Sequence, residues 1–368
     1  MNSRSAPTDL PDPSGPSDPA DPAGENGTFA TVKATDVSWE DVRRLTMVLF
    51  LQHTGELVLV RERDRLIVPS GPVRGGESAY LDTALRLPLE IAGFRMQNKY
   101  TLGARGDHVA VWSEGHRYAG DRPHRIDAEW WTGDAAHGAA ALRAQGDQSV
   151  AKLVELANAA RLSLSDEQFF DETVHLLETA YLDERNTNPM QGSGFGGTEE
   201  AWHAGRAHLC GAVTRPGSFL DVGCANGYLL ECLVQWSGER GVALDPFGVD
   251  LSARMVDDAR RRLPRWAHHF MSGNSLDWVD PDGRRFDYVH TLLEIVPAPR
   301  HHELIDHLLS EVVAPGGRLI LSHYVPVVEQ DQWPRAIVEA LGYEVAGETR
   351  PKAVPRLRVP PSVWITKR

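Results

Sequence analysis

The chain has 368 residues, a net charge of −13 and 42% hydrophobic residues. This length suggests about two domains, and the globular composition excludes collagen, a coiled coil and full disorder. The acidic balance argues against nucleic acid as a partner, because neutralising phosphates needs a basic face. The sequence has no long apolar run, no secretory signal and only three cysteines. We therefore expect a cytoplasmic protein that does not enter a membrane.

The first part of the chain predicts a tail followed by an α+β domain. Residues 1–28 are rich in Pro, Asp, Ser and Gly, which predicts a disordered tail. The runs 45–51 and 57–60 predict a β-hairpin. The remaining elements expected up to residue 160 are a helix at 78–92, strands at 108–112 and 127–131, and helices at 135–144 and 148–160. We place the first domain at residues 39–160.

The second part of the chain predicts a parallel sheet. A helix is expected to start after Ser163 or Ser165, either of which can cap it, and to end near Tyr181. Beyond residue 217 strands and helices alternate, which is typical of βαβ units. The first two expected strands are 218–222 and 247–250. We place this second domain at residues 163–368.

Two acids follow two successive strands of this expected sheet. Asp221 precedes a loop containing Gly223 and Gly227, where a backbone without Cβ atoms allows a ligand to come close. Asp250 ends the next strand, where an acid can accept hydrogen bonds from two ribose hydroxyls. The loop lacks the full G-x-G-x-x-G pattern, and Asp221 would repel a pyrophosphate. An acid at that position suits a ligand with an ammonium group, such as S-adenosylmethionine.

This ordered series of motifs resembles the class I S-adenosylmethionine-dependent methyltransferases. The resemblance implies a Rossmann-like seven-stranded methyltransferase sheet, and S-adenosyl-L-methionine as the cofactor. It also implies strands at 286–291, after the turn at 314–317, at 343–345 and at 362–366. Asp221, Gly223, Ala225 and Gly227 match the motif beside the methionine moiety, and Asp250 and Leu251 match the ribose and adenine positions. The loop Asn274, Ser275 and Leu276 matches the adenine-reading segment, with Asn in place of the more usual Asp. Thr291 matches a position facing the donor.

The candidate catalytic residues are Glu294, His323 and Tyr324, which lie near the ends of the fourth and fifth strands expected from the resemblance. A hydroxyl acceptor needs a base, whereas an amine needs one only to become neutral. We expect no metal site, because the histidines at 301, 302 and 307 lack the i, i+4 spacing of a zinc-binding helix.

The first domain resembles a Nudix fold. Gly71 and Glu77 have the spacing that opens the Nudix box. The continuation departs from the family, because Leu87 and Ile91 stand where metal-binding glutamates are expected and Pro88 interrupts the helix. The resemblance therefore implies a Nudix-like scaffold without hydrolase activity, with a role in substrate recognition or dimerisation.

The sequence favours methyl transfer to a small molecule, such as a natural-product intermediate. An RNA or protein methyltransferase is the first alternative. A Nudix-type nucleotide hydrolase or a nucleotide-binding regulator is the second. The sequence leaves a homodimer open and does not identify the methyl acceptor.

Overall fold

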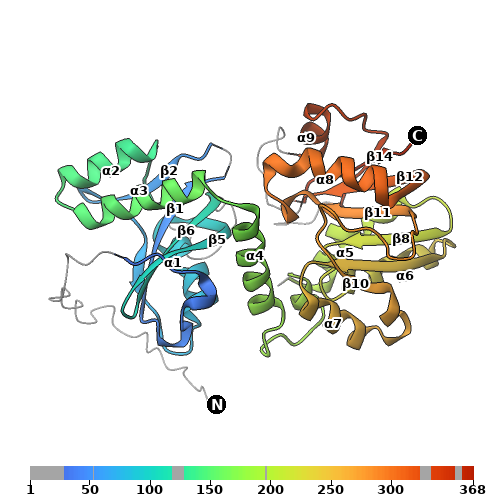
Figure 1. The fold of residues 1–368 in the computed structure, drawn as a ribbon, viewed down its shortest axis with the longest axis horizontal. Coiled ribbons are helices and arrows are strands. Elements are labelled where there is room, and N and C mark those ends of the chain that lie inside the picture. Colours follow the sequence, from blue (N-terminus) through green and yellow to red (C-terminus); the bar gives the residue numbers. More distant parts are fainter. Residues whose placement is uncertain (1–28, 53, 118–127, 195–196, 324–332, 353–358) are drawn as a thin grey trace, which may run out of the picture.

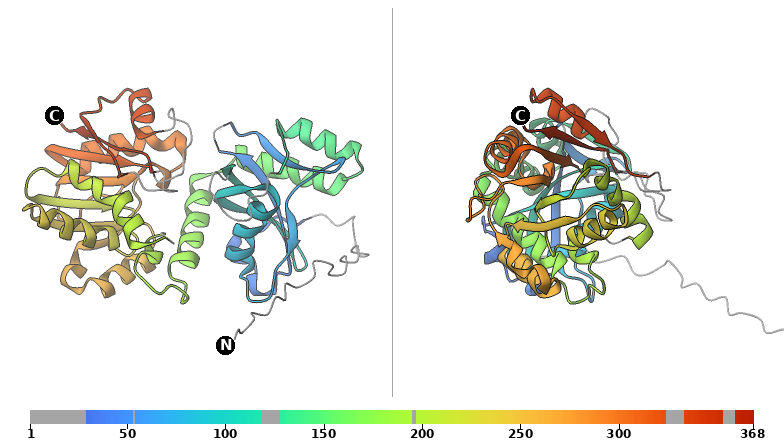
Figure 2. Two further views of the ribbon diagram at one scale, coloured as in Figure 1. Left: turned by 180° about the vertical axis from the view of Figure 1, so that it is seen from behind. Right: turned by 90° about the vertical axis from the view of Figure 1, so that its right-hand side faces the viewer.

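The computed structural model describes residues 29–52, 54–117, 128–194, 197–323, 333–352 and 359–368. Two β-sheets lie side by side, and helix α4 (Asp166–Tyr181) runs between them (Figure 1). The view from behind shows the same two bodies on either side of this helix (Figure 2). The expected tail at 1–28 lies outside the described residues.

The first sheet is mixed and has seven strands. They are β1 (Arg44–Leu51), β2 (Leu57–Glu62), β3 (Arg65–Ile67), β4 (Ser70–Pro72), β5 (Phe94–Arg105), β6 (His108–Arg117) and β7 (Trp130–Gly133). The order is β3-β2-β1-β6-β5, with β4 paired to β1 and β7 paired to β2. Leu49 lies opposite Val58 in an antiparallel pair, which confirms the predicted hairpin. Strands β1 and β6 run parallel.

Three helices complete this domain at the expected places. They are α1 (Ala84–Ala92), α2 (Ala135–Ala144) and α3 (Gln148–Leu162). A π-helical turn, Ala79–Thr83, precedes α1, and the hydroxyl of Ser78 caps it by accepting a hydrogen bond from the N–H of Leu81. Pro88 lies inside α1 and is buried. Helices α2 and α3 cover one face of the sheet, where their apolar side chains pack on β1, β2, β5 and β6.

The second sheet also has seven strands, in the order β10-β9-β8-β11-β12-β14-β13. They are β8 (Gly217–Val222), β9 (Leu244–Asp250), β10 (Phe270–Ser272), β11 (Phe286–Leu292), β12 (Val313–Ser322), β13 (Gly347–Thr349) and β14 (Ser362–Thr366). The five strands from β10 to β12 are parallel, and β14 is antiparallel to both of its neighbours. This arrangement confirms the expected methyltransferase-type sheet.

Helices cover both faces of the second sheet. They are α5 (Glu199–Arg206), α6 (Tyr228–Glu239), α7 (Ala253–Arg262), α8 (His301–His307) and α9 (Pro334–Ala340). Apolar residues of α5, α6 and α7 form one core with the sheet, and those of α8 and α9 form another. The site residues therefore stand at the ends of strands buried on both faces, which is typical of a parallel sheet.

One predicted strand is wrong. Residues 343–345 are irregular, and the strand before β14 is β13, four residues further along. Tyr343 instead donates its hydroxyl hydrogen to Asp306 across a distance of 2.6 Å. Gly347 pairs with Trp364, and a Cβ at Gly347 would lie 2.0 Å from the Trp364 ring. A glycine argues against a strand in sequence analysis. Here the strand needs one, because the Trp364 indole occupies the space that a side chain at position 347 would fill.

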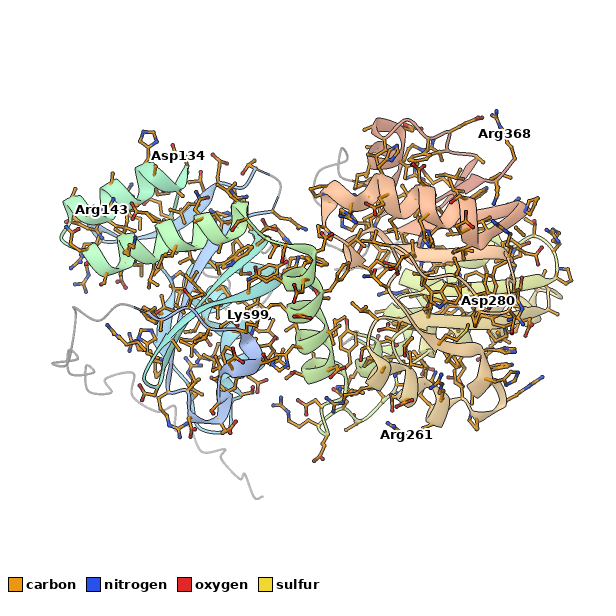
Figure 3. All side chains as sticks on the ribbon, viewed as in Figure 1. Lys99, Asp134, Arg143, Arg261, Asp280 and Arg368 are labelled. Atoms are coloured by element: carbon orange, nitrogen blue, oxygen red, sulfur yellow. The ribbon has the colours of Figure 1, made fainter. Side chains whose placement is uncertain are left out.

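Helix α4 supplies a hydrogen-bond acceptor to β5, the outer strand of the first sheet. Its carboxylate Glu172 accepts a hydrogen bond from the N–H of Thr101 on the edge strand β5, at 3.1 Å. Close to Thr101 on the same strand, the Lys99 side chain (Figure 3) is 1% exposed, and among the described residues its Nζ has no hydrogen-bond partner. Nζ lies 3.0 Å from the centre of the Tyr80 ring and 4.7 Å from that of Trp39. Burial lowers the pKa of Lys99 well below its usual range, so the folded protein disfavours the charged form of this amine.

Replacing Lys99 by methionine should stabilise the protein. Keeping Lys99 protonated costs free energy in the folded protein, because its pKa is lowered there and ordinary in the unfolded chain. Lys99→Met removes this cost and an unpartnered buried polar group, and should add about 1–2 kcal/mol to the free energy of unfolding. The gain should be larger at pH 6 than at pH 9, since raising the pH relieves the same cost in the unsubstituted protein. Thermal unfolding at both pH values measures it.

The matched control is Lys152→Met on α3, where the lysine is exposed. This change should leave the unfolding temperature nearly unchanged at both pH values. A lower unfolding temperature for Lys99→Met would mean that the amine contributes net stability through the aromatic rings.

Candidate functional site

The predicted cofactor residues gather at one edge of the second sheet. Since β8 to β12 run parallel, their carboxyl ends meet there, at the point where the strand order reverses between β8 and β11. Asp221 lies near the end of β8, Asp250 ends β9, and Asn274 follows β10. Thr291 lies near the end of β11, and His323 follows β12. Tyr324 lies outside the described residues.

The loop after β8 bends sharply through left-handed backbone conformations. Gly223 has φ +86° and Gly227 has φ +72°, and between them Ala225 has φ +47°. Such conformations are natural for glycine and costly for alanine. The N–H of Ala225 donates to Asp250 Oδ2 at 2.8 Å, which holds the loop against the end of the neighbouring strand.

Asp250 has both carboxylate oxygens engaged by backbone donors. Oδ2 accepts from Ala225, and Oδ1 accepts from the N–H of Ser252 at 2.9 Å. The side chain is 8% exposed, and this burial raises the pKa of Asp250. Each oxygen has a further lone pair, so the carboxylate can still accept hydrogen bonds from a ligand.

Asp221 is partnered by a histidine that the motif analysis did not include. Its Oδ1 lies 2.7 Å from Nδ1 of His290 on the adjacent strand β11. Both side chains are buried. The register places the two residues directly opposite each other, so the contact follows from the pairing of β8 with β11.

The predicted adenine loop forms a compact turn. Asn274 Oδ1 accepts a hydrogen bond from the N–H of Leu276 at 3.0 Å, so the side chain shapes its own loop. Ser275 is buried, whereas Leu251 and Leu276 are partly buried. Leu276 packs against the core of the second sheet.

The predicted acceptor-side residues include one close pair. His323 Nε2 lies 3.8 Å from Glu294 Oε2, and both side chains are largely buried. Thr291 is fully buried, and its hydroxyl donates to the carbonyl of Val222 at 3.1 Å, which ties β11 to β8. Behind this pair, His301 is hydrogen-bonded through Nε2 to the carbonyl of Leu293, and burial lowers its pKa to about 4.

Three polar residues join the site although the sequence analysis missed them: the buried Arg206 and His290, and the partly buried Tyr181. Desolvation raises the pKa of Tyr181 to about 12, with smaller contributions from the charges of Asp250 and Glu294. Arg206 also acts on Tyr181 and is itself buried at the end of α5. The available signal for His290 was a histidine near the carboxyl end of a mostly buried strand.

A cavity of about 550 Å³ lies next to this edge, between the segment after α4 and helix α7. Tyr181 and Asn226 line it on the site's side, and Arg254, Arg261 and Asp257 are among its outer residues. None of the predicted cofactor residues line it. Within the described ranges no three side chains are grouped as metal ligands, and no helix is long and apolar enough to cross a membrane.

Comparisons with known proteins agree with this geometry. Residues 219–317 match the family model described as a methyltransferase domain. Trans-aconitate 2-methyltransferase of Rhodopseudomonas palustris strain HaA2 is 34% identical over 90 residues, which are 24% of this chain and 33% of the relative. The enzyme of the same name from strain BisB18 is 31% identical over 137 residues, which are 34% and 50%. The chain thus spans no more than half the length of these relatives.

Among solved structures, magnesium protoporphyrin IX methyltransferase from Synechocystis PCC 6803 with bound S-adenosylmethionine is 20% identical. The alignment covers 56% of this chain and 99% of that one, with a TM-score of 0.37. The family match does not extend into the first sheet. The family match thus identifies a methyltransferase domain at residues 219–317, and S-adenosylmethionine is the methyl donor that this match implies.

Proposed function

We propose that this protein transfers a methyl group from S-adenosylmethionine to a small-molecule acceptor. The observation that carries the proposal is the pair of buried acids, Asp221 and Asp250, at the ends of adjacent strands beside a left-handed glycine loop. A carboxylate in such a place suits a ligand that has both a ribose and an ammonium group. S-adenosylmethionine has both, and it supplies the methyl group when bound.

The described residues fit this donor in charge and in position. Asp250 would accept hydrogen bonds from the ribose hydroxyls, and Asp221 would face the ammonium group. The loop of Gly223, Ala225 and Gly227 would run along the methionine moiety. Thr291 would lie beneath the donor. The residues in contact with the adenine would be Leu251, Asn274, Ser275 and Leu276.

Glu294 and His323 are the proposed acceptor-side residues. Their separation of 3.8 Å allows one to orient the other, and such a pair can take a proton from a hydroxyl acceptor. The names of the curated relatives describe methyl transfer to trans-aconitate, an anion with several carboxylates. The buried cation Arg206 would offer a counter-charge to an acceptor of that kind. Tyr324 stays a candidate.

Transfer of labelled methyl groups tests this function and separates the alternatives. The protein is incubated with methyl-labelled S-adenosylmethionine and a cell extract separated into small molecules, protein and RNA. We expect label in the small-molecule fraction, and mainly among its acids. Label in RNA or protein alone would replace the proposal by the alternative of a macromolecular acceptor. Absence of transfer to every fraction would favour a binding regulator.

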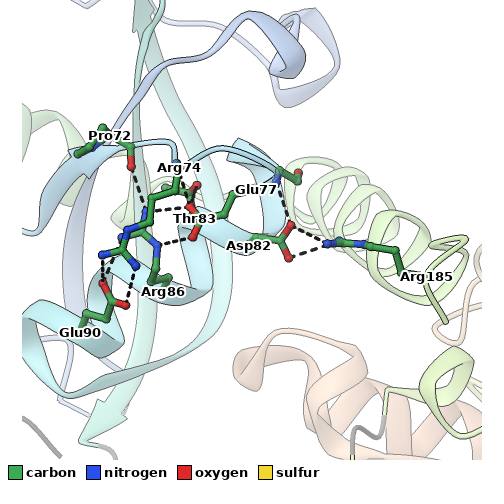
Figure 4. Close-up of polar contacts among 9 residues, drawn as sticks. Pro72, Arg74, Glu77, Asp82, Thr83, Arg86, Glu90 and Arg185 are labelled. Carbon is green, nitrogen blue, oxygen red and sulfur yellow. Dashed lines mark hydrogen bonds and ion pairs between the residues drawn. The ribbon is translucent and has the colours of Figure 1, made fainter. Parts of the chain in front are cut away.

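We further propose that residues 39–160 form a Nudix-like scaffold that lacks hydrolase activity. Arg86 donates to both oxygens of Glu77, at 2.7 and 2.8 Å, and also to Glu90 at 3.2 Å (Figure 4). Arg74 donates two further hydrogen bonds to Glu90. The hydrogen bonds from Arg86 lower the pKa of Glu77 to about 2. Guanidinium groups thus hold the acids that a metal ion would need.

The proposed role of this scaffold is substrate recognition or dimerisation. One contact that supports it links the π-helical turn before α1 to the segment after α4. Arg185 donates to Asp82 at 3.0 and 3.3 Å, and Asp82 also accepts from the N–H of Ser78 (Figure 4). The scaffold is therefore tied to the chain that leads into the methyltransferase domain.

Substituting Asp250 should weaken donor binding. Asn keeps one acceptor oxygen for the loop but loses the charge that strengthens hydrogen bonds from the ribose, each worth ~1.5–3 kcal/mol. Asp250→Asn should therefore lower the affinity for S-adenosylmethionine by about tenfold or more. Asp245→Asn, at the exposed start of β9, is the matched control. Calorimetry that finds equal affinity in the folded Asp250 variant would remove this residue from the site.

The protein should release no phosphate from nucleoside diphosphate derivatives when magnesium is added. Two carboxylates already held by arginines make a poor oxygen cage for Mg²⁺. Phosphate release and the unfolding temperature are measured with and without magnesium, and neither should change. Magnesium-dependent hydrolysis that Glu77→Gln abolishes would restore the hydrolase alternative.

A further inference from the structure

A continuous row of polar side chains runs from Asp221 across the second sheet; four of its members are buried and the fifth, His208, is partly buried. His290 Nδ1 lies 2.7 Å from Asp221, and its Nε2 lies 3.0 Å from Ser322 Oγ on β12. Ser322 Oγ lies 2.6 Å from Ser362 Oγ on β14, which in turn lies 3.0 Å from Nε2 of His208. Four neighbouring strands and the segment before β8 thus contribute one side chain each.

When His290 is neutral, the available hydrogen atoms allow only one assignment of donors and acceptors along this row. The carboxylate of Asp221 only accepts, so His290 donates from Nδ1 and accepts at Nε2. Ser322 must then donate to His290, Ser362 to Ser322, and His208 to Ser362. Burial lowers the pKa of His208 to about 4, which suits a neutral ring that donates from Nε2. Every donor then points toward Asp221, and hydrogen bonds in such a chain strengthen one another.

Asp221, His290 and Ser322 have the connectivity of a hydrolase triad, but this geometry excludes that role. The Ser322 hydroxyl is 1% exposed and is already bonded to both His290 and Ser362. A nucleophile needs access to its substrate. The row must therefore act through Asp221, the one member that belongs to the proposed donor site.

The contact with His290 engages only one oxygen of Asp221. Within the described residues, Oδ1 accepts from His290 and Oδ2 accepts no hydrogen bond. A carboxylate fixed at one oxygen cannot rotate freely, so the second oxygen keeps a defined direction. Fixing a binding group in advance lowers the entropic cost of holding a ligand.

We propose that His290 is a positioning residue for the donor, aiming Asp221 at the ammonium group of the methionine moiety, with Ser322, Ser362 and His208 fixing the His290 ring. This inference rests on the proposed function, because it needs the donor at this edge of the sheet. It assigns a binding role to a residue that touches Asp221 rather than the donor itself.

Two ligands separate this role from a structural one. S-adenosylhomocysteine carries the amino acid moiety, whereas 5′-methylthioadenosine shares the adenosine and lacks the amine. His290→Leu should weaken S-adenosylhomocysteine by about tenfold, as expected for a misdirected charged hydrogen bond, and leave methylthioadenosine within about twofold. His290→Asn places a donor where Nδ1 stood and should recover most of the loss. Calorimetry on the full chain measures all affinities.

Ser362→Ala tests the same row without touching Asp221, and it keeps the test valid when the leucine variant does not fold. It should weaken S-adenosylhomocysteine about threefold and spare methylthioadenosine. His302→Leu, which removes an exposed histidine on α8, is the control and should change neither affinity.

The outcomes are distinct. Equal losses for both ligands, or no loss, in the folded variants would overturn the positioning role while the proposed function stands. Failure of the unsubstituted protein to bind either ligand would instead overturn the proposed function, and this inference with it.

Discussion

Helix α4 packs against two hydrophobic cores at once, and the placement of both sheets depends on that packing. Phe169 is buried in the core under α2 and α3, and Phe170 contacts that core and the core of the second sheet. Toward the end of the helix, Glu178 accepts hydrogen bonds from Ser252 and Arg254 beside the donor site. A displacement of α4 would therefore disturb the first sheet and the residues around Asp250 together.

Features that depend on residues close together in the chain were predicted well from the sequence. Hairpin, helix caps and alternating strands come from local periodicity, and Asp221 and Asp250 follow directly from their strand ends. His290 was missed because its role depends on lying opposite Asp221 in the pairing of β11 with β8. The sequence of either strand alone does not determine that register. The strand at Gly347 was misplaced for a similar reason, since the ring of Trp364 that requires the glycine comes from β14.

The N-terminal domain also contains contacts that the sequence alone does not predict. The proposed Nudix-like scaffold was expected to lack hydrolase activity because Leu87 and Ile91 stand where metal-binding glutamates are expected, and that inference needed only the motif. The partners of the remaining acids depend on three-dimensional contacts, because Arg86 reaches Glu77 at the loop and Glu90 one turn along α1. The motif alone therefore does not predict which side chains these acids contact.

The acidic residues of the two domains have different hydrogen-bond donors. Glu77 and Glu90 meet guanidinium groups, so their charge is cancelled within the protein and little attraction remains for a cation. Asp221 and Asp250 meet a histidine and backbone N–H groups, and within the described residues neither meets an arginine. Neutral donors stabilise a carboxylate without cancelling its charge. Within the described residues no arginine cancels the charge of the second pair. This suits a donor with an ammonium and a sulfonium group, and we therefore assign the chemistry to the second sheet and a supporting role to the first.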